Sequence, residues 1–403
     1  MNQNRSLTTS DGLDTIILGY HGPTPPVSQL PLRGERFWVD RPEQLLHAVS
    51  LLKHARVVGV DAEFTQVRLR TSKEVVSTVP RLALLQLAID RYCFVVDALR
   101  LRDLLPLMEI VGNPSIAILL HGAGGDIRVM AERGLHVAHY YDLEATSRSI
   151  FGQHESSLAA MLQRAFAFHL DKSLQRTDWT RRPLAPAMVA YAARDAEVTL
   201  ALYHWLDQHY HAILELQKST GVADPVARWI EPFLHSNSSL SAEMAVTDAK
   251  TRGLIHNRAQ VLADCRAALV TVRHPMRRSR LLRLIADLSL DQLAVDILPL
   301  LHAATADERS ASVRALGRLG VKSAEAAMRS LLHDPVQEVR KAAQASLRNL
   351  DENEKEPPVQ RATPIVAADG TRSWIVEKQQ QQTQQGTDEE TGWKSRLRSI
   401  IDA

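Results

Sequence analysis

The chain has 403 residues, of which 45% are hydrophobic and 23% are charged, and its formal net charge at pH 7 is +2. This length predicts two or three domains, and the composition is typical of a globular protein with ordinary cores. A charge so close to neutral excludes a chain that binds nucleic acid through overall basicity, so any positive surface must be local.

The two cysteines, Cys93 and Cys265, are far apart in the sequence, so neither a disulfide framework nor a cysteine-based zinc site is predicted. No apolar run approaches the roughly 18 residues of a membrane span, and the N-terminus lacks the basic-then-apolar pattern of a signal peptide. We therefore expect a cytoplasmic protein without a membrane partner.

Residues 1–35 contain several prolines and predict an irregular segment, because proline fits neither helix interiors nor strand ladders. Asp40 with Glu43 three positions later resembles the capping box of a helix that runs to about residue 55. Residues 66–79 are polar and predict a connecting loop. The other predicted elements in this part are strands at 37–39, 57–64, 81–89, 92–97 and 115–120, and a helix at 101–111.

Residues 57–64 read Val-Val-Gly-Val-Asp-Ala-Glu-Phe, and their apolar run predicts a strand buried on both faces. Asp61 and Glu63 are two positions apart, so both carboxylates point to one face of this strand. Two carboxylates about 4 Å apart repel by roughly 4 kcal/mol at an effective dielectric constant near 20. Divalent cations, which prefer oxygen ligands, would offset this repulsion. An acidic strand end that meets solvent is the alternative interpretation.

The strand at 115–120 ends in His-Gly-Ala-Gly-Gly-Asp at positions 121–126, and a helix is expected from about residue 127. Glycines allow a tight turn there, and Asp126 lies where a helix N-terminus favours negative charge. Asp126 is therefore a candidate functional acid, with a plain helix cap as the alternative. The glycine spacing fits neither a dinucleotide-binding fingerprint nor a P-loop, so we do not favour a phosphate cradle.

Residues 171–183 combine an aromatic residue, Trp179, with four basic residues: Lys172, Arg176, Arg181 and Arg182. Such interleaving suits the phosphates and bases of a nucleic-acid strand. We interpret Trp179 itself as an anchor that packs this loop onto the core.

A helix is predicted to begin near Pro186, because proline is favoured in the first helical turn. Tyr191 and Asp195 are four positions apart on this helix, so a phenol and a carboxylate share one face. A core tyrosine hydrogen-bonded to a nearby acid is the alternative interpretation.

Residues 36–215 resemble the DEDDy family of 3′→5′ exonucleases, and within it the ribonuclease D branch. The resemblance rests on four motifs in order: Asp61-Ala62-Glu63, Asp126 at the end of its glycine-rich turn, the stretch from Lys172 through Asp178-Trp179 to Arg182-Pro183-Leu184, and Tyr191-x-x-x-Asp195. It implies an α/β fold of the ribonuclease H-like type, with a mixed sheet flanked by helices. The glycine-rich turn departs from the bulkier residues usual in this branch, which bears on substrate preference.

The resemblance also implies a chemistry. Asp61, Glu63, Asp126 and Asp195 would hold two Mg²⁺ or Mn²⁺ ions, and Tyr191 would orient the attacking water. Single-stranded RNA or DNA would be shortened from its 3′ end, with release of nucleoside 5′-monophosphates. Further residues expected to contact the substrate are Phe64, Thr65, His121, Lys172 and Arg182.

The second half of the chain is predicted to be helical. Residues 216–290 are expected to form a helical connection, and residues 291–350 predict helix pairs at 292–303 with 308–319 and at 323–333 with 335–350. Val313-Arg314 recurs as Val339-Arg340 in the next pair, and the pattern resembles short HEAT-like repeats that offer a surface for a protein partner. Residues 258–289 are expected to form an earlier, degenerate pair. Residues 351–403 are rich in acids and glutamine and predict a disordered tail.

A basic run in this half consists of Arg273, Arg277, Arg278, Arg280 and Arg283. It is either a solvated helix face or a patch that guides nucleic acid. Three hypotheses for the whole chain follow. We favour a metal-dependent 3′→5′ exonuclease that acts on RNA; a DNA exonuclease and a HEAT-type interaction scaffold with an inactive nuclease domain are the alternatives.

Overall fold

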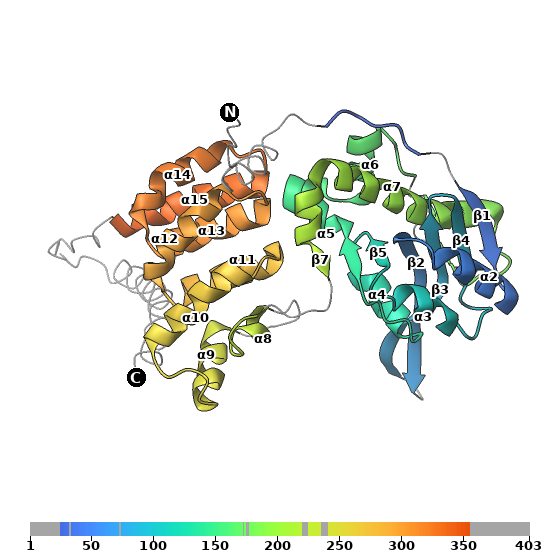
Figure 1. Ribbon diagram of the computed structural model, residues 1–403, viewed down its shortest axis with the longest axis horizontal. Helices are drawn as coiled ribbons and strands as arrows, with labels where there is room; N and C mark the ends of the chain where they lie inside the picture. Colours follow the sequence, from blue (N-terminus) through green and yellow to red (C-terminus); the bar gives the residue numbers. More distant parts are fainter. Residues whose placement is uncertain are drawn as a thin grey trace, which may run out of the picture. The chain divides into compact units, whose positions relative to one another are not determined.

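The computed structural model describes residues 25–31, 34–71, 74–171, 173–174, 177–219, 225–234 and 241–354. The chain divides into two compact units, residues 1–223 and 224–403 (Figure 1). The first unit is built around a β-sheet, whereas the described part of the second unit is helical. The disordered tail was predicted at 351–403, but residues 351–354 are the end of a helix, and residues 355–403 and 1–24 lie outside the described residues.

The sheet of the first unit has the strand order β1-β4-β3-β2-β5-β6-β7 among the described residues. Strand β2 is central and pairs antiparallel with β3 and parallel with β5. The strands are β1 (Glu35–Val39), β2 (Val57–Thr71), β3 (Glu74–Ile89), β4 (Tyr92–Asp97), β5 (Ala117–Leu120), β6 (Tyr140–Asp142) and β7 (Lys218–Ser219). The mixed sheet flanked by helices that the sequence predicted is therefore confirmed.

Helices cover both faces of this sheet (Figure 1). The helices of this unit are α2 (Pro42–Leu52), α3 (Met108–Val111), α4 (Gly124–Ala131), α5 (Leu143–Phe151), α6 (Leu158–Phe166) and α7 (Pro186–Leu216), with short 3₁₀ turns at Leu105–Leu107 and Gln153–Glu155. One buried cluster joins β2 and β3 to residues of α2, α3 and α4. A second cluster, on the opposite face, joins β3 and β4 to Ala192, Ala193 and Ala196 of α7.

A glycine in β2 allows α7 to approach the sheet closely. A Cβ atom added to Gly59 would lie 2.5 Å from the backbone oxygen of Ala196 and 3.0 Å from Cβ of Leu200. Real Cβ atoms do not tolerate such contacts, so only glycine fits without moving the helix. Gly59 is two positions before Asp61, and Ala196 directly follows Asp195, so this approach brings two of the candidate acids together.

Two local predictions were wrong. Residues 66–71 and 74–79 are strand rather than loop, because β2 and β3 extend through them, with Val67 paired with Val79 and Thr71 with Glu74. The backbone pairing of two long strands overrides the polar composition.

Helix α2 also begins later than predicted. Pro42 occupies the first helical turn, and Arg41 is the N-cap. The side-chain oxygen of Gln44, not of Glu43, accepts hydrogen bonds from the backbone N–H groups of Asp40 (3.0 Å) and Arg41 (3.1 Å). Proline lacks an N–H and suits the first turn, which shifts the capping box by one position.

The second unit consists of successive helix pairs around one buried cluster. Its helices are α8 (Glu231–Leu234), α9 (Ala242–Thr251), α10 (Arg258–Thr271), α11 (Pro275–Asp287), α12 (Ala294–Ile297), α13 (Ala306–Arg318), α14 (Glu325–Ser330) and α15 (Gln337–Glu354). Helices α11, α13 and α15 pack side by side (Figure 1).

The sequence interval of the repeat in this unit is longer than the interval that the recurring Val-Arg pairs predicted. Arg278, Arg309 and Arg340 recur at equal intervals and lie on α11, α13 and α15. Each donates a hydrogen bond to the carbonyl oxygen six positions before it, at distances of 2.8, 3.0 and 2.6 Å. Arg314 and Arg340 are closer in sequence than this interval, so the two Val-Arg pairs do not occupy equivalent positions.

The predicted basic run is partly used inside this unit. Arg278 donates to Glu308 at 2.6 Å, and Arg280 donates to the carbonyl oxygen of Leu234 at 2.9 Å. These two arginines stabilise helix packing, so a nucleic-acid patch made of the whole run is not supported. Arg283 is the more exposed residue and lies 3.6 Å from Asp287.

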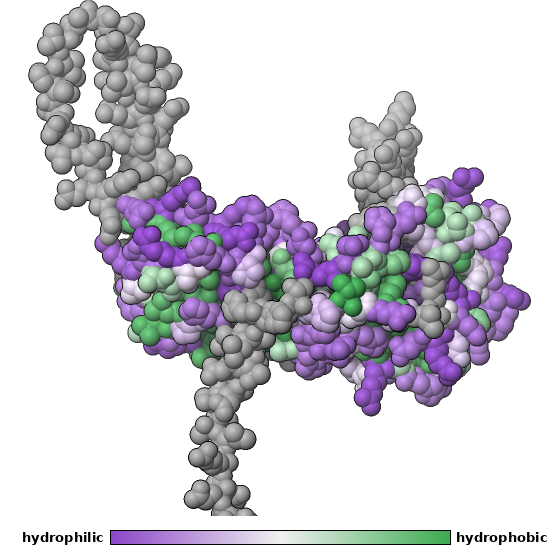
Figure 2. Space-filling model, turned by 90° about the horizontal axis from the view of Figure 1, so that it is seen from above, coloured by the Kyte–Doolittle hydropathy of each residue, from purple (hydrophilic) through white to green (hydrophobic). Residues whose placement is uncertain are grey.

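The surface of the molecule is mostly polar on the face shown in Figure 2, and hydrophobic residues form scattered groups over both units. Within the described ranges, no helix combines the length and apolar character needed to span a membrane.

Candidate active site

Strand β2 carries the first two candidate acids. Asp61 and Glu63 lie on the face of the sheet that α7 covers, because they share the parity of Gly59, which contacts that helix. Apolar residues of β3 and β4 on the same face, including Leu84 and Val95, are buried together with alanines of α7, so this face of the sheet is covered. The acids are therefore fixed on a central strand rather than on a mobile loop.

Helix α7 supplies a carboxylate and a phenol to the same place. Ligand oxygens of Asp61, Glu63 and Asp195 all lie within 4.8 Å of one another. The hydroxyl of Tyr191, one turn before Asp195, donates a hydrogen bond to the Asp195 carboxylate. The i, i+4 spacing places both side chains on the face of α7 that meets the sheet.

Asp126 reaches these residues from the other neighbour of β2. It lies in the first turn of α4, directly after β5, and is 9% exposed. The pairing of β2 with β5 ends at Gly59, so the backbone N–H of Ala62 further along β2 can donate to the Asp126 carboxylate. Asp126 thus lies near enough for its charge to act on Glu63, but its carboxylate is not among the ligand oxygens that lie within 4.8 Å of one another.

The site is electrostatically unfavourable without cations. Burial, together with the charges of Asp61, Asp195 and Asp126, raises the pKa of Glu63 to about 9. Burial also raises the pKa values of Asp61 and Asp126, and the neighbouring Asp61 charge adds to the shift of Asp126. Burial and the same acids raise the pKa of the Tyr191 phenol, so it stays protonated at neutral pH.

The residues present fit a pair of hard divalent cations. All four acidic side chains offer carboxylate oxygens, which Mg²⁺ and Mn²⁺ prefer. Carboxylates that are buried this close together and held partly protonated gain most from a bound cation, because it removes both the repulsion and the need for protons. Among the described residues, no histidine or cysteine joins the clustered ligands, so the cluster does not resemble a zinc site.

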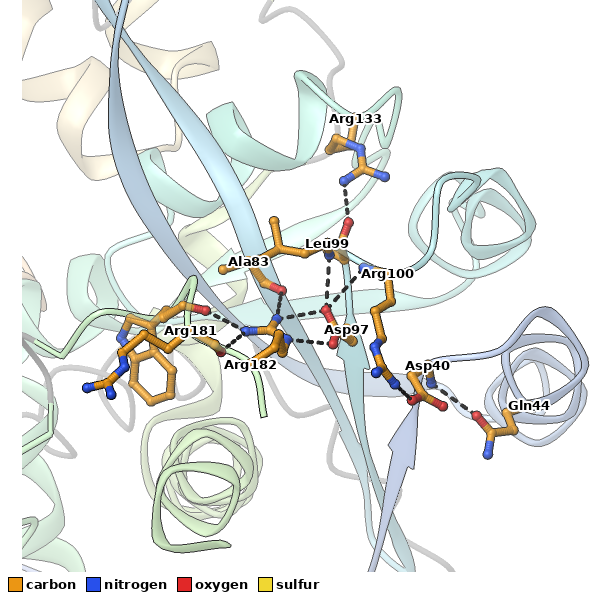
Figure 3. Close-up of polar contacts among 11 residues, drawn as sticks. Asp40, Gln44, Ala83, Asp97, Leu99, Arg100, Arg133, Arg181 and Arg182 are labelled. Atoms are coloured by element: carbon orange, nitrogen blue, oxygen red, sulfur yellow. Dashed lines mark hydrogen bonds and ion pairs between the residues drawn. The ribbon is translucent and has the colours of Figure 1, made fainter. Parts of the chain in front are cut away.

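Arg182, which was expected to contact the substrate, is engaged by other groups of the protein. Its guanidinium donates to both carboxylate oxygens of Asp97, at 2.6 and 2.7 Å, and to the backbone oxygen of Ala83 at 3.2 Å (Figure 3). It also donates to the carbonyl oxygens of Trp179 and Arg181 in its own loop. Asp97 is fully buried at the end of β4. Arg182 therefore ties the loop before α7 to the sheet.

The same loop is anchored by Trp179, as the sequence predicted. Trp179 is 2% exposed, and its ring centroid lies 6.0 Å from that of Tyr191. Lys172, the other expected substrate contact in this stretch, lies outside the described residues.

The remaining expected substrate contacts have mixed surroundings. A ring nitrogen of His121 lies 3.0 Å from the carbonyl oxygen of Ser156, which occupies one polar atom of this side chain. Phe64 is half-buried against the cluster under α4, and a Cβ on Gly125 would lie 3.5 Å from its ring. Thr65 is half-buried on β2. Phe64 and Thr65 keep their predicted role as proposals.

Two supporting contacts were not predicted. The carboxylate of Asp142 accepts hydrogen bonds from the backbone N–H groups of Gly122 (3.0 Å) and Ala123 (3.2 Å), and so fixes the turn before Asp126. Gly122 has φ of +81°, which favours glycine at this turn. The ion pair between Asp97 and Arg182 was also missed. Only the tertiary fold brings these partners together.

Comparisons with known proteins point to one family. A family model described as 3′-5′ exonuclease matches residues 37–210. Ribonuclease D from Haemophilus influenzae is 27% identical over 165 residues, which are 41% of this chain and 39% of that protein. Protein RRP6-like 3 from Arabidopsis thaliana is 30% identical over 166 residues, which are 40% of this chain and 18% of that protein. Each of these matches covers less than half of the relative's length.

A solved structure of ribonuclease D from Escherichia coli is also similar. It is 19% identical, with a TM-score of 0.37, and the alignment covers 80% of this chain and 76% of that chain.

Proposed function

We propose that the protein hydrolyses single-stranded RNA from its 3′ end, because residues 37–210 match the 3′-5′ exonuclease family model. The observation that carries the proposal is the convergence of Asp61, Glu63 and Asp195 within 4.8 Å, with Asp126 bound to the intervening backbone. RNA is favoured over DNA because similar proteins are named ribonuclease D.

The four acids are proposed to hold two divalent cations. Asp61 and Glu63 on β2, Asp126 on α4 and Asp195 on α7 would supply the oxygen ligands. When bound, such ions activate a water molecule and stabilise the negative charge that develops on the leaving oxygen. The carboxylates bind the ions in their ionised form, so metal binding releases protons from this site.

Tyr191 is proposed to orient the attacking water. Its phenol stays protonated because burial and three nearby acids raise its pKa, so it acts through hydrogen bonding and not as a base. The water oxygen bonds to the phosphorus of the last phosphodiester while the bond to the 3′ oxygen of the preceding nucleotide breaks. A proton from the water is lost to solvent and one returns to that 3′ oxygen, which leaves a nucleoside 5′-monophosphate and a shortened strand.

The test is to incubate the purified full chain with 5′-labelled RNA and DNA oligonucleotides in Mg²⁺, Mn²⁺ or EDTA. The proposal predicts a ladder of products shortened from the 3′ end on RNA, dependent on metal. A ladder on DNA alone would favour the DNA exonuclease. No ladder on either substrate would favour a scaffold with an inactive nuclease domain.

Helix α7 offers a matched control for each of two proposed roles: Asp195 as a metal ligand, and Tyr191 as the residue that orients the water. Asp195→Asn should abolish the ladder, whereas Asp207→Asn, three turns further along and hydrogen-bonded to His211 at 2.7 Å, should not. Tyr191→Phe should lower the rate roughly 100-fold through misplaced water, whereas Tyr203→Phe should leave it unchanged. Equal losses in the site and control variants would contradict the assignment.

A further inference from the structure

A glutamine in the central sheet lies directly opposite the first candidate acid. Gln86 on β3 pairs with Asp61 on β2 in antiparallel register, and with Val95 on β4 on its other side. Directly opposed residues on antiparallel strands place their side chains on the same face, with Cβ atoms about 4.5–5.5 Å apart. Gln86 therefore lies beside Asp61, under the alanines of α7.

The amide of Gln86 is fully buried and has no protein partner among the described residues. The residue is 0% exposed, and within the described part of the chain neither Nε2 nor Oε1 donates or accepts a hydrogen bond. Its strand neighbours at 82–85 and 87–88 are all buried and apolar. A buried amide without a partner is unfavourable, so a leucine or methionine would suit an ordinary core position better. The amide thus points to a contact made in the working state of the site.

The group best placed to accept a hydrogen bond from this amide is the carboxylate of Asp61. Metal binding requires the ionised carboxylate, whose oxygens have several lone pairs. Nε2 of Gln86 carries two N–H groups on the same face of the sheet.

We propose that Gln86 is a positioning residue that donates a hydrogen bond to the Asp61 carboxylate when the site holds metal. The hydrogen bond fixes the orientation of this carboxylate and leaves its other lone pairs for the cation. Gln86 acts through Asp61 and does not itself contact the substrate. The inference deepens the proposed function and rests on it, because it assumes that Asp61 is a metal ligand.

Gln86→Met tests this role, because methionine keeps the unbranched shape and removes the amide. Hydrogen bonds to metal ligands typically change metal affinity about 10–100-fold. We expect Mn²⁺ binding to the full chain, measured by isothermal titration calorimetry, to weaken by about this factor. Cleavage of RNA at saturating Mn²⁺ should stay within a few-fold of wild type, whereas the Mn²⁺ concentration for half-maximal rate should rise in parallel. Replacing a residue that merely fills the core would not weaken Mn²⁺ binding while leaving the cleavage rate at saturating Mn²⁺ nearly unchanged.

Val95→Ala is the matched control, because it perturbs packing at the paired position of β4 without removing a hydrogen bond. Its Mn²⁺ affinity should equal that of wild type. If Gln86→Met does not fold, as judged by circular dichroism in EDTA, Gln86→Leu decides the question in the same assay. Unchanged Mn²⁺ affinity in the folded Gln86 variant would overturn the positioning role alone. A wild-type chain that binds no Mn²⁺ would overturn the proposed function and this inference with it.

Discussion

Replacing Asp61 with asparagine should stabilise the metal-free protein while removing its response to metal. Asparagine keeps the shape of the side chain and removes one negative charge from the cluster of Asp61, Glu63 and Asp195. At their separation of 4.8 Å or less, two full charges repel by roughly 3 kcal/mol at an effective dielectric constant near 20. Part of this repulsion is already relieved, because burial raises the pKa values of these carboxyl groups and keeps them partly protonated.

We therefore expect Asp61→Asn to raise the free energy of unfolding of the metal-free exonuclease unit by about 1–2 kcal/mol. For a unit of this size, 1 kcal/mol corresponds to roughly 2–4 °C in Tm, so the Tm in EDTA should rise by several degrees. In wild type, Mn²⁺ at about 100 times its Kd should add close to 3 kcal/mol through binding to the folded state. The variant should lose most of this gain.

The assay is differential scanning calorimetry of the full chain in EDTA and in a series of Mn²⁺ concentrations. Asp207→Asn, an exposed acid on α7, is the control and should behave like wild type in both conditions. A variant that is less stable than wild type in EDTA and still gains the full Mn²⁺ increment would refute the reasoning.

Three further outcomes are expected. Gly59→Ala should lower Tm and weaken Mn²⁺ binding, because its Cβ would displace α7 at Ala196; a Tm and affinity equal to wild type would contradict the close approach. Arg182→Met should destabilise the protein by about 3–5 kcal/mol, measured by urea unfolding, because it leaves the buried Asp97 carboxylate without its partner; a loss below about 1 kcal/mol would argue against this anchor. In EDTA, stability should fall as pH rises from about 4.5 towards 9, because the folded state retains the Glu63 proton that the unfolded state loses; a flat profile would contradict the raised pKa of this group.

Features that depend on strand alternation were predictable from the sequence. The two-position spacing of Asp61 and Glu63 is enough to place them on one face of β2. Asp126 and Asp195 were joined to them through the ordered motifs of a family, because no local rule links residues so far apart. In the structure, β5 pairs with the edge of β2 and leads into α4, which carries Asp126, whereas α7, which carries Asp195, packs on one face of β2.

Long-range partners explain the main failures. The basic character of Arg182 suggested a phosphate contact, but a buried acid at the end of another strand engages it. The polar segment at 66–79 suggested a loop, but pairing with its neighbour extends both strands. Gln86 is the single polar residue between Leu82 and Ile89 of β3, and only the register shows which acid it faces.

The helical repeats show how a pattern can be found with the wrong period. The Val-Arg pairs at 313–314 and 339–340 suggested an interval that is too short. The structure gives the longer interval from Arg278 to Arg309 and Arg340, because equivalent arginines must bond to the same carbonyl position in each helix pair. Backbone conformation follows the same period: Ser289 and Gly320, which are separated by the same interval as these arginines, both have positive φ after their helices.

The most direct test of the account is a crystal soaked in Mn²⁺ and measured for anomalous scattering. Two strong peaks are expected in contact with the carboxylates of Asp61, Glu63, Asp126 and Asp195. A map with full Mn²⁺ occupancy elsewhere on the molecule and no peak at these four acids would contradict the account.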